Sequence, residues 1–324
     1  MKKYDFISID NALMDVLVKA SDEDIKRFNL TKGNMHLVTE ADQSLLLSHF
    51  EKSEKAMELG GSALNTIRAL TLLGTKTVFA GMVGRDSIGQ KIKDRFEEIG
   101  IISKLRESDI GSGTCVILVT YDGERTMNTY LGSSRLFDED LVPHDEIKDA
   151  KFFHFSGYQW DTEGQKRAIN AAINTAKASG TLVSFDVADP FVVGRFEESF
   201  RQMIEDSADI VFANEEEAKL LYRSSPEEAA DKIARAGAIG VIKLGGKGAL
   251  ISKGDQRIRI DALDANVIDT TGAGDMFAAG FLYGLHRNRD LKKCGEIGTL
   301  LASDVISRIG AKVSDEVLDK VASM

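Results

Sequence analysis

The chain has 324 residues, of which 43% are hydrophobic and 28% are charged, and its formal net charge is −10. This length and balance predict a globular protein with one large domain or two ordinary ones. Lys and Arg are interleaved with Asp and Glu throughout, so the sequence offers no basic block that would bind nucleic acid.

The cysteines and the N-terminus indicate a reduced, cytoplasmic protein. Cys115 and Cys294 are the only cysteines, lie far apart, and form no CxxC or metal-ligand spacing with the five histidines. The opening MKKYDFISID reaches Asp5 and Asp10 before any apolar run of signal-peptide length, and no segment has 18 uninterrupted apolar residues. We therefore expect neither export nor a membrane anchor.

Short apolar runs alternate with segments of helical spacing along most of the chain. Runs such as YDFISID, KTVFAGMVG, KFFHFSG, TLVSFDVA and DIVFAN predict strands. After the second of these, apolar residues recur every three or four positions up to Ile99, and Gly100 stands where a helix would end. Residues 165–180, 214–222 and 226–237 show the same helical spacing. This alternation predicts a doubly wound, mainly parallel α/β sheet with helices on both faces.

Two regions break the alternation, at about 13–40 and 101–131. They contain strand-like pieces and turn signals such as YDGER, without a convincing helix between the later strands. We interpret them as strands of a small second sheet that projects from the main domain. Because no linker of low complexity separates two halves, we expect residues 1–324 to form a single domain.

The most informative stretch is VIDTTGAGDMFAAGF, residues 267–281, where a strand-like run passes through glycines into an apolar helix. It is not a Walker A loop, because GxxxxGK followed by Ser or Thr occurs nowhere in the chain. It is not a dinucleotide fingerprint either, because Phe277 stands where the third glycine of GxGxxG would lie. Small residues before a helix let a phosphate approach backbone N–H groups at the positive end of the helix dipole. We therefore predict an anion hole at Gly272, Ala273 and Gly274.

Asp275 stands at the head of this helix, and the sequence admits two interpretations of it. A carboxylate at a helix start is ordinarily a capping residue. Beside a bound γ-phosphate, the same carboxylate would accept the proton of an attacking hydroxyl. Spacing alone favours neither interpretation.

DTTGAGD followed by an apolar helix resembles the C-terminal signature of the PfkB, or ribokinase-like, family of carbohydrate and nucleoside kinases. ELGGSALNTIRALTLLG resembles the N-terminal signature of that family, although alone it would indicate a Gly turn before a buried helix. Further matches follow in family order from residue 4 to past 300. The resemblance implies a ribokinase-like α/β fold with a small β-sheet lid, transfer of phosphate from ATP, and Asp275 as the catalytic base.

The resemblance also implies which residues bind the substrate and the cofactors. NEEEA resembles the NxxE motif that organises Mg²⁺ through water, whereas alone it would be a favourable acidic helix start. Relatives often hold a K⁺ ion beside the anion hole. The implied residues are Asn11, Asp15, Gly60, Gly61, Asn65, Arg125 and Tyr158 for the substrate; Asn214, Lys243, Gly245 and Gly248 for ATP; Asn214 and Glu217 for Mg²⁺; and Asp269 and Thr271 for K⁺.

Three features are similar to those of adenosine kinases within the family. They are the opening DNALMDVLVKA, the lid segment that contains Cys115 and Arg125, and FSGY, which places Tyr158 where an aromatic ring would stack on a purine. Tyr158 equally suits the edge of a core. We expect adenosine as the acceptor, with fructose, ribose or 2-keto-3-deoxygluconate as the alternative. The apolar lid residues Met35 and Leu37 bear on this choice.

Two further classes of protein are alternatives to a kinase. A nucleotide-binding protein without catalysis would not need Asp275 beside an anion hole. A nicotinamide-dependent oxidoreductase is disfavoured because the GxGxxG pattern is absent. The expected partners are ATP and a small-molecule acceptor, with no nucleic acid and no membrane, and the protein is expected to be a monomer or a homodimer.

Overall fold

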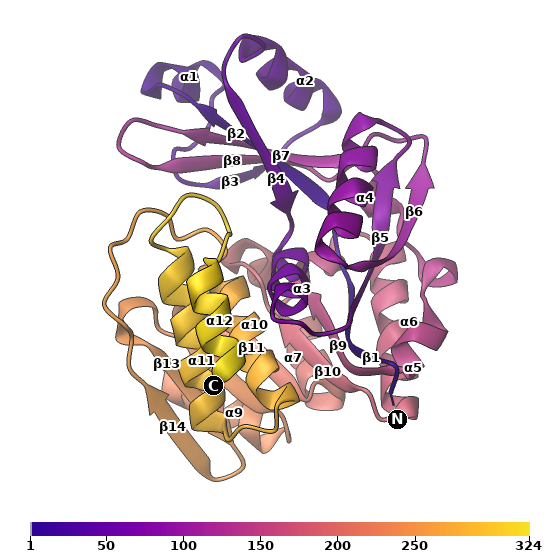
Figure 1. Cartoon of the computed structure of the whole chain (residues 1–324), viewed down its shortest axis with the longest axis vertical. Coiled ribbons are helices and arrows are strands. Elements are labelled where there is room, and N and C mark those ends of the chain that lie inside the picture. The colour runs from indigo at the N-terminus through magenta and orange to yellow at the C-terminus, as the bar shows by residue number, and fades with distance from the viewer. Residues whose placement is uncertain (1) are drawn as a thin grey trace.

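The strands form two sheets of unequal size in the computed structural model, which describes residues 2–324 (Figure 1). In this part of the chain the larger sheet has nine strands, in the order β14-β13-β12-β11-β10-β9-β1-β5-β6. Neighbouring strands are parallel from β12 to β6, and β13 and β14 are added by antiparallel pairs. The strands are Tyr4–Ile9 (β1), Thr77–Gly84 (β5), Ile102–Ser108 (β6), Ala150–Ser156 (β9), Leu182–Asp186 (β10), Ile210–Asn214 (β11), Ile239–Lys243 (β12), Ala249–Lys253 (β13) and Gln256–Ile260 (β14).

Helices cover both faces of the larger sheet, and each face has its own buried core (Figure 1). One core lies under α5 to α9 and the other under α3, α4 and α10 to α12. This architecture confirms the predicted doubly wound α/β fold. The helices are Ser62–Leu72 (α3), Ser87–Ile99 (α4), His144–Lys148 (α5), Glu163–Ser179 (α6), Pro190–Ser207 (α7), Glu215–Tyr222 (α8), Pro226–Arg235 (α9), Ala273–His286 (α10), Leu291–Val305 (α11) and Asp315–Ser323 (α12), with 3-10 turns at Gly132–Leu136 (η1), Glu139–Leu141 (η2), Gly157–Trp160 (η3) and Gly245–Lys247 (η4).

Helix α4 illustrates how local sequence sets an element. The side chain of Asp86 accepts a hydrogen bond of 2.7 Å from the backbone N–H of Gly89, which caps the first turn. Ile92 and Phe96 are fully buried on the face toward the sheet. Gly100 has a φ of 92° and ends the helix in the left-handed region, as its position in the sequence predicts.

The smaller sheet has the order β3-β8-β7-β2-β4 in the described residues and lies at the top of the molecule in Figure 1. Two short helices, α1 and α2, pack on it through buried residues such as Ile25 and Leu46, which form a separate small core. The elements are Leu13–Lys19 (β2), Asp22–Arg27 (α1), Met35–Leu37 (β3), Glu40–His49 (α2), Lys55–Gly60 (β4), Gly113–Val119 (β7) and Arg125–Tyr130 (β8).

The limits of the smaller sheet differ from the two predicted ranges. Strand β4 at 55–60 joins it from outside those ranges, and α1 lies in a region predicted as strands. Strand β6 at 102–108 belongs to the larger sheet instead. As the edge strand of that sheet, β6 keeps several side chains partly exposed, and its sequence therefore alternates like a strand of a half-exposed sheet.

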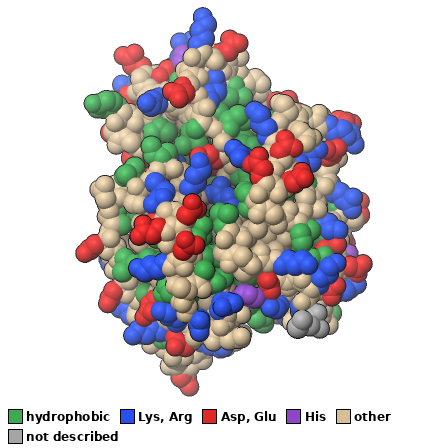
Figure 2. All heavy atoms as spheres, viewed as in Figure 1, with side chains coloured by type: hydrophobic (Ala, Val, Ile, Leu, Met, Phe, Trp, Pro, Cys, Tyr) green, Lys and Arg blue, Asp and Glu red, His purple; other side chains and the backbone are tan. Residues whose placement is uncertain are grey.

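The surface carries positive and negative side chains together, as the interleaved charges of the sequence predict. On the face shown in Figure 2, Lys and Arg side chains are interspersed with Asp and Glu, without a block of one sign. Within residues 2–324, none of the helices combines the length and the apolar character required to cross a membrane.

Candidate active site

Two adjoining cavities lie where the parallel strands of the larger sheet end. The carboxyl ends of β1, β10, β11 and β12 bring Asp10, Asp186, Asn214 and Lys243 to one edge of the sheet. Ligands of open parallel sheets bind at this edge. The larger cavity has a volume of about 890 Å³ and the smaller one about 520 Å³.

The cavities share a short boundary, and Asp275 lies on it. A bound molecule in either cavity would therefore contact the same carboxylate. The residues that line both cavities are Ser62, Ala188, Asn214, Thr270, Gly272 and Asp275.

The carboxylate of Asp275 is held by helix α3 rather than by its own helix. Ser62 Oγ donates to Oδ1 at 2.7 Å, and Asn65 Nδ2 donates to Oδ2 at 2.9 Å. Burial raises the pKa of Asp275 to about 6, although these two hydrogen bonds act to lower it. A carboxylate with a raised pKa between two ligand cavities is suited to accept a proton. The N-cap of α10 is Gly272, which has no side chain to cap the helix, and the carboxylate of Asp275 bonds to α3 instead.

Helix α10 begins at the predicted anion hole. Gly272 has a φ of 75°, and a Cβ atom there would lie 2.5 Å from Cβ of Ala311, so only glycine fits this position. Gly272, Ala273 and Gly274 all line the larger cavity. Gly272 is the N-cap of α10, and Ala273 and Gly274 begin its first turn, where backbone N–H groups can bind an anion. The N–H of Ala273 donates to the backbone oxygen of Thr270 at 3.2 Å and would have to give up this bond to bind an anion.

Lys243 brings a buried positive charge to the same turn. Its Nζ lies 2.9 Å from Oδ2 of Asp186, and it would be 3.0 Å from a Cβ atom at Gly274. Burial acts to lower the pKa of Lys243, but the charges of Asp186 and Glu217 outweigh burial and raise it. The ammonium group therefore stays protonated beside the anion hole.

Asn214 and Glu217, the predicted Mg²⁺ residues, form a capping box at the start of α8. Glu217 N–H donates to Asn214 Oδ1 at 2.8 Å, and Asn214 N–H donates to Glu217 Oε2 at 2.7 Å. Burial raises the pKa of Glu217 to about 7, so a nearby cation would stabilise its charged form. Both residues line the larger cavity and carry oxygen atoms, which are the ligands that Mg²⁺ prefers. Because these oxygens already accept hydrogen bonds within the pair, the arrangement fits a Mg²⁺ ion that is bound through water.

The larger cavity also contains the predicted ATP residues of the β12–β13 turn. Gly245 and Gly248 both line it and both have positive φ, of 57° and 87°. A Cβ atom at Gly248 would lie 1.9 Å from the backbone oxygen of Ile260, so this turn requires glycine. Lys243 and Asn214 line the same cavity, which brings the predicted ATP residues together.

The smaller cavity contains most of the predicted substrate residues. Asn11, Asp15, Gly61 and Asn65 line it, and Asn11 is fixed by a hydrogen bond of 3.0 Å from Gln165 Nε2 to its Oδ1. Gly60 lies directly behind the carboxylate of Asp15, because a Cβ atom at Gly60 would be 2.0 Å from Oδ1 of Asp15.

Asp15 is the polar group of the cavity that is best placed to bind a ligand. Burial raises its pKa to about 7, partly offset by the positive charge of Arg68. An otherwise buried carboxylate that faces a cavity is suited to accept hydrogen bonds from ligand hydroxyl groups.

Much of the lining of the smaller cavity is apolar. Leu37 and Phe191 in this lining are 44% and 53% exposed, which leaves large apolar surface for a ligand to cover. The predicted residue Tyr158 both lines the cavity and packs on the core beneath it. The apolar lining consists of Leu13, Met35, Leu37, Ile117, Met127, Leu131, Tyr158, Phe191, Val192 and Phe196.

Arg125 does not line the smaller cavity, in contrast to its predicted role at the substrate. Its Nη2 lies 2.7 Å from Oδ2 of Asp269, and its Nη1 donates to Oγ1 of Thr271 at 3.1 Å. The Nη2 contact is an ion pair without hydrogen-bond geometry. The side chains of Arg125 and Asp269 are only 9% and 4% exposed.

Asp269 and Thr271 do not fit the K⁺ role in this arrangement. Asp269 Oδ1 accepts from the backbone N–H of Thr271 at 3.0 Å, and Oδ2 accepts from that of Gly310 at 2.7 Å. With the guanidinium of Arg125 against the same carboxylate, a second cation there would meet like-charge repulsion.

Sequence reasoning missed three residues that position the site. Asp10 is buried and accepts from the backbone N–H of Ser156 at 3.0 Å, which ties β1 to the turn that carries Tyr158. Asp186 pairs with Lys243, and Ala188 adopts a φ of 80° on the boundary of the cavities. Strained backbone in a non-glycine residue is common at ligand sites. Each lies at a strand end, which was the one signal in the sequence that could have found them.

Comparison with known proteins distinguishes a kinase from the nicotinamide-dependent oxidoreductase considered as an alternative. A family model described as pfkB family carbohydrate kinase matches residues 35–317. The chain belongs to the pfkB family of carbohydrate kinases. As a member of this family it is a sugar or nucleoside kinase, and hence a phosphotransferase. The resemblance predicted from DTTGAGD and GGSALN is confirmed.

Solved structures of a probable sugar kinase and of an adenosine kinase are similar to this chain over nearly its whole length. A probable sugar kinase from Rhizobium etli is 33% identical, with a TM-score of 0.92 and coverage of 100% of this chain and 99% of that one. The adenosine kinase from Sinorhizobium meliloti is 32% identical, with a TM-score of 0.90 and coverage of 99% of each chain. The adenosine kinase of Saccharomyces cerevisiae is 27% identical over 96% of this chain and 97% of its own length. These likenesses confirm the ribokinase-like fold and leave the acceptor open between sugars and nucleosides.

Proposed function

We propose that this pfkB family member is an ATP-dependent nucleoside kinase that phosphorylates a primary hydroxyl group of adenosine. The observation that carries the proposal is the shape and lining of the smaller cavity. Its volume of about 520 Å³ exceeds what a single sugar ring would fill, and ten of its lining residues have large apolar side chains. A purine would cover part of this apolar lining, while Asn11 and Asp15 would hold the ribose hydroxyl groups.

Catalysis would take place on the boundary between the cavities. Asp275 would accept the proton of the attacking hydroxyl group while Ser62 and Asn65 keep its carboxylate in place. Backbone N–H groups of Gly272 to Gly274 would stabilise the negative charge that spreads over the transferred phosphoryl group.

The larger cavity would hold ATP, with its phosphates toward the start of α10. Lys243 would place its charge beside the phosphates. Asn214 and Glu217 would hold Mg²⁺ through water, and the ion would supply further charge neutralisation there. The smaller sheet would act as a lid that excludes water from the transferring phosphate.

The acceptor is tested by measuring ADP release from ATP and Mg²⁺ with adenosine, inosine, ribose, fructose and 2-keto-3-deoxygluconate. We expect adenosine to be used best, and Phe191→Ala to raise its KM about tenfold, because loss of an aromatic contact costs up to about 1.5 kcal/mol. Leu45→Ala is the control, since Leu45 is also exposed but lies on α2 outside the cavity. Faster release with a sugar than with either nucleoside would replace the proposal by the sugar kinase alternative.

We also propose that the reaction needs no monovalent cation at Asp269, because Arg125 supplies the positive charge there. Turnover should be equal within about twofold in KCl and in tetramethylammonium chloride at the same ionic strength. Arg125→Ala should lower turnover and make the remainder respond to K⁺, since it leaves the carboxylate of Asp269 buried and without a cation. A wild-type rate that rises tenfold with K⁺ would show that this ion pair is absent from the working enzyme.

A further inference from the structure

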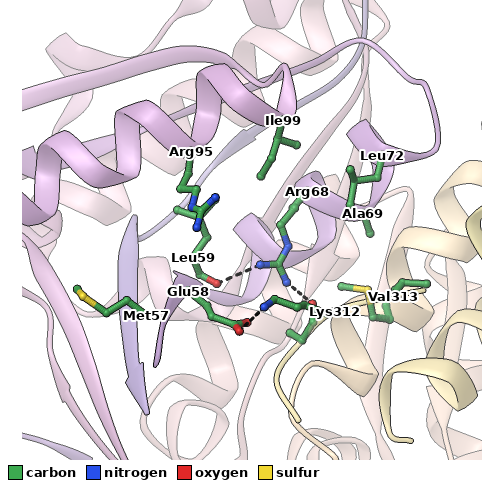
Figure 3. A pocket seen from close by; sticks show the side chains of 12 residues that line it. Met57, Glu58, Leu59, Arg68, Ala69, Leu72, Arg95, Ile99, Lys312 and Val313 are labelled. Carbon is green, nitrogen blue, oxygen red and sulfur yellow. Dashed lines mark hydrogen bonds and ion pairs between the residues drawn. The ribbon is translucent and has the colours of Figure 1, made fainter. Parts of the chain in front are cut away.

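A third cavity lies outside the two that form the candidate active site. It has a volume of about 290 Å³ and lies between strand β4 of the smaller sheet, helices α3 and α4, and the loop at 311–313 (Figure 3). Of the residues that line the active-site cavities, none lines this one. Its lining residues are Met57, Glu58, Leu59, Arg68, Ala69, Leu72, Arg95, Ile99, Met276, Ala311, Lys312 and Val313.

Positive charge dominates the polar part of this third cavity. Three cations, Arg68, Arg95 and Lys312, and one carboxylate, Glu58, line this cavity, and Glu58 is paired with Lys312 at 2.5 Å (Figure 3). Arg95 has its acidic partner, Glu98, outside the lining and exposed to solvent. Two cations of the lining therefore have no acidic partner within it.

Arg68 is the most unusual of the three. Its side chain is on α3, the residue is only 8% exposed, and no carboxylate of residues 2–324 lies within salt-bridge distance of it. Its guanidinium donates instead to two backbone oxygens, at 3.4 Å to Leu59 and at short range to Ala311. Burial lowers the pKa of Arg68, and the carboxylates of Glu58 and Asp15 stabilise its charge only from beyond salt-bridge distance. A guanidinium has five N–H donors, so further donors remain free, and a buried charge without a close ionic partner is costly.

The remainder of the lining is apolar. Leu72 is 48% exposed, and Ile99 and Val313 also belong to the lining. Methionine at position 57 adds a flexible side chain that adapts to different shapes. A ligand with both an anionic end and an apolar end would satisfy both parts.

We propose that this third cavity is a binding site for a small organic phosphate, with the phosphate held by Arg68, Arg95 and Lys312. Planar guanidinium groups bind phosphate oxygens in a bidentate manner, which favours a phosphate over a neutral ligand. The apolar portion of the ligand lies against Leu72 and Ile99. The site does not depend on which acceptor the enzyme phosphorylates.

An occupant of this site would be coupled to the anion hole through the loop at 310–313. The backbone N–H of Gly310 donates to Asp269, and Ala311 contacts Gly272 where α10 begins. Arg68 lies on the helix whose first residues hold Asp275. Because β4 belongs to the smaller sheet, the ligand also joins that sheet to the larger one. A ligand that binds more tightly when the two sheets and the loop at 310–313 are arranged as in this structure shifts the protein toward that conformation.

Binding is tested by calorimetry on the full chain with phenyl phosphate, inorganic phosphate and benzoate as probes. We expect phenyl phosphate to bind most tightly, because it alone combines the phosphate with an apolar ring. Arg95→Met should weaken it about tenfold, and Leu72→Glu should abolish binding by placing a carboxylate at the rim. Lys93→Met is the matched control, because Lys93 lies on the same helix and pairs with Glu107 away from the cavity.

The anion hole also binds phosphate, so the measurement is repeated with saturating ATP. Affinity for phenyl phosphate that persists with ATP, and that falls in Arg95→Met but not in Lys93→Met, supports the third cavity. Affinity that is equal in all variants, or lost on adding ATP, overturns the proposal. Preferential binding of benzoate would overturn the choice of a phosphate. Calorimetry needs no turnover, so failure of the nucleoside assignment leaves this result readable.

The coupling is tested by the KM for ATP with and without phenyl phosphate. We expect a change of at least about threefold in the wild type and none in Leu72→Glu. The same KM in all cases would overturn the coupling.

Discussion

Asp275→Asn should reduce turnover about 100- to 10,000-fold while leaving the fold and ligand binding intact. An amide cannot take the proton of the attacking hydroxyl group. The replacement is otherwise tolerated, because Ser62 can still donate to the remaining oxygen. Asn65 can turn its amide so that Oδ1, which is buried and has no partner among the described residues, accepts from the new NH₂ group. Steady-state kinetics with ATP and adenosine measure the effect.

Binding of ATP and adenosine by calorimetry serves as the internal control for this variant, and both affinities should stay within about threefold of the wild type. Asp138→Asn is a matched substitution, because that carboxylate lies at the surface in an ion pair with Arg167. It should leave turnover unchanged. If Asp275→Asn retained near-normal turnover, the proton would be accepted elsewhere and the proposed mechanism would be wrong.

The pH dependence of the wild type follows from the same carboxylate. Burial raises the pKa of Asp275 to about 6 and that of Asp15 to about 7, and the two negative charges also repel each other. The base acts when deprotonated, so kcat/KM should be level at high pH and should fall as the pH drops through this window. A profile that stays level down to pH about 5 would be inconsistent with Asp275 as the base.

Lys243→Met should lower the free energy of unfolding by about 3 to 5 kcal/mol and also abolish most of the activity. The side chains of Lys243 and Asp186 are 16% and 4% exposed, and Glu217 is buried beside them. Removing the ammonium group leaves two buried carboxylates without a cation, next to Asp275. Denaturation in urea, with fixed slope, measures the loss of stability.

Lys247→Met is the control for this second variant. Lys247 follows the same strand, but its pair with Glu215 is exposed, at 66% and 50% for the two side chains. An exposed ion pair contributes at most about 1 kcal/mol. Equal losses of stability in the two variants would mean that the cluster around Lys243 is hydrated in solution and does not carry a buried charge pair.

Several elements of the site could be predicted because their sequence signals are local. The anion hole depends on small residues at consecutive positions, and the structure places Gly272 in a left-handed conformation where no side chain fits. The capping box of Asn214 and Glu217 depends on a spacing of three residues. In both cases the residues that form the local structure are neighbours in the chain, so a short motif is enough to predict that structure.

Other elements could not be predicted because their partners are distant in the chain. Arg125 lies 146 residues before Thr271 in the chain. Their contact places Arg125 at the turn before α10, whereas the sequence predicted it at the substrate site. Strand β6 looked like part of the smaller sheet, because exposure at a sheet edge produces the same alternation of side chains in either sheet.

By itself, the sequence determined the α/β alternation, the glycine turn before α10 and the family, since these rest on periodicity and on motifs of adjacent residues. Only the tertiary structure decided that α3 holds the carboxylate of Asp275, that Lys243 is balanced by Asp186, and that Arg68 lies buried with no carboxylate of residues 2–324 at salt-bridge distance. Burial and the sum of nearby charges fix the pKa of each such group, and both depend on segments that only folding brings together.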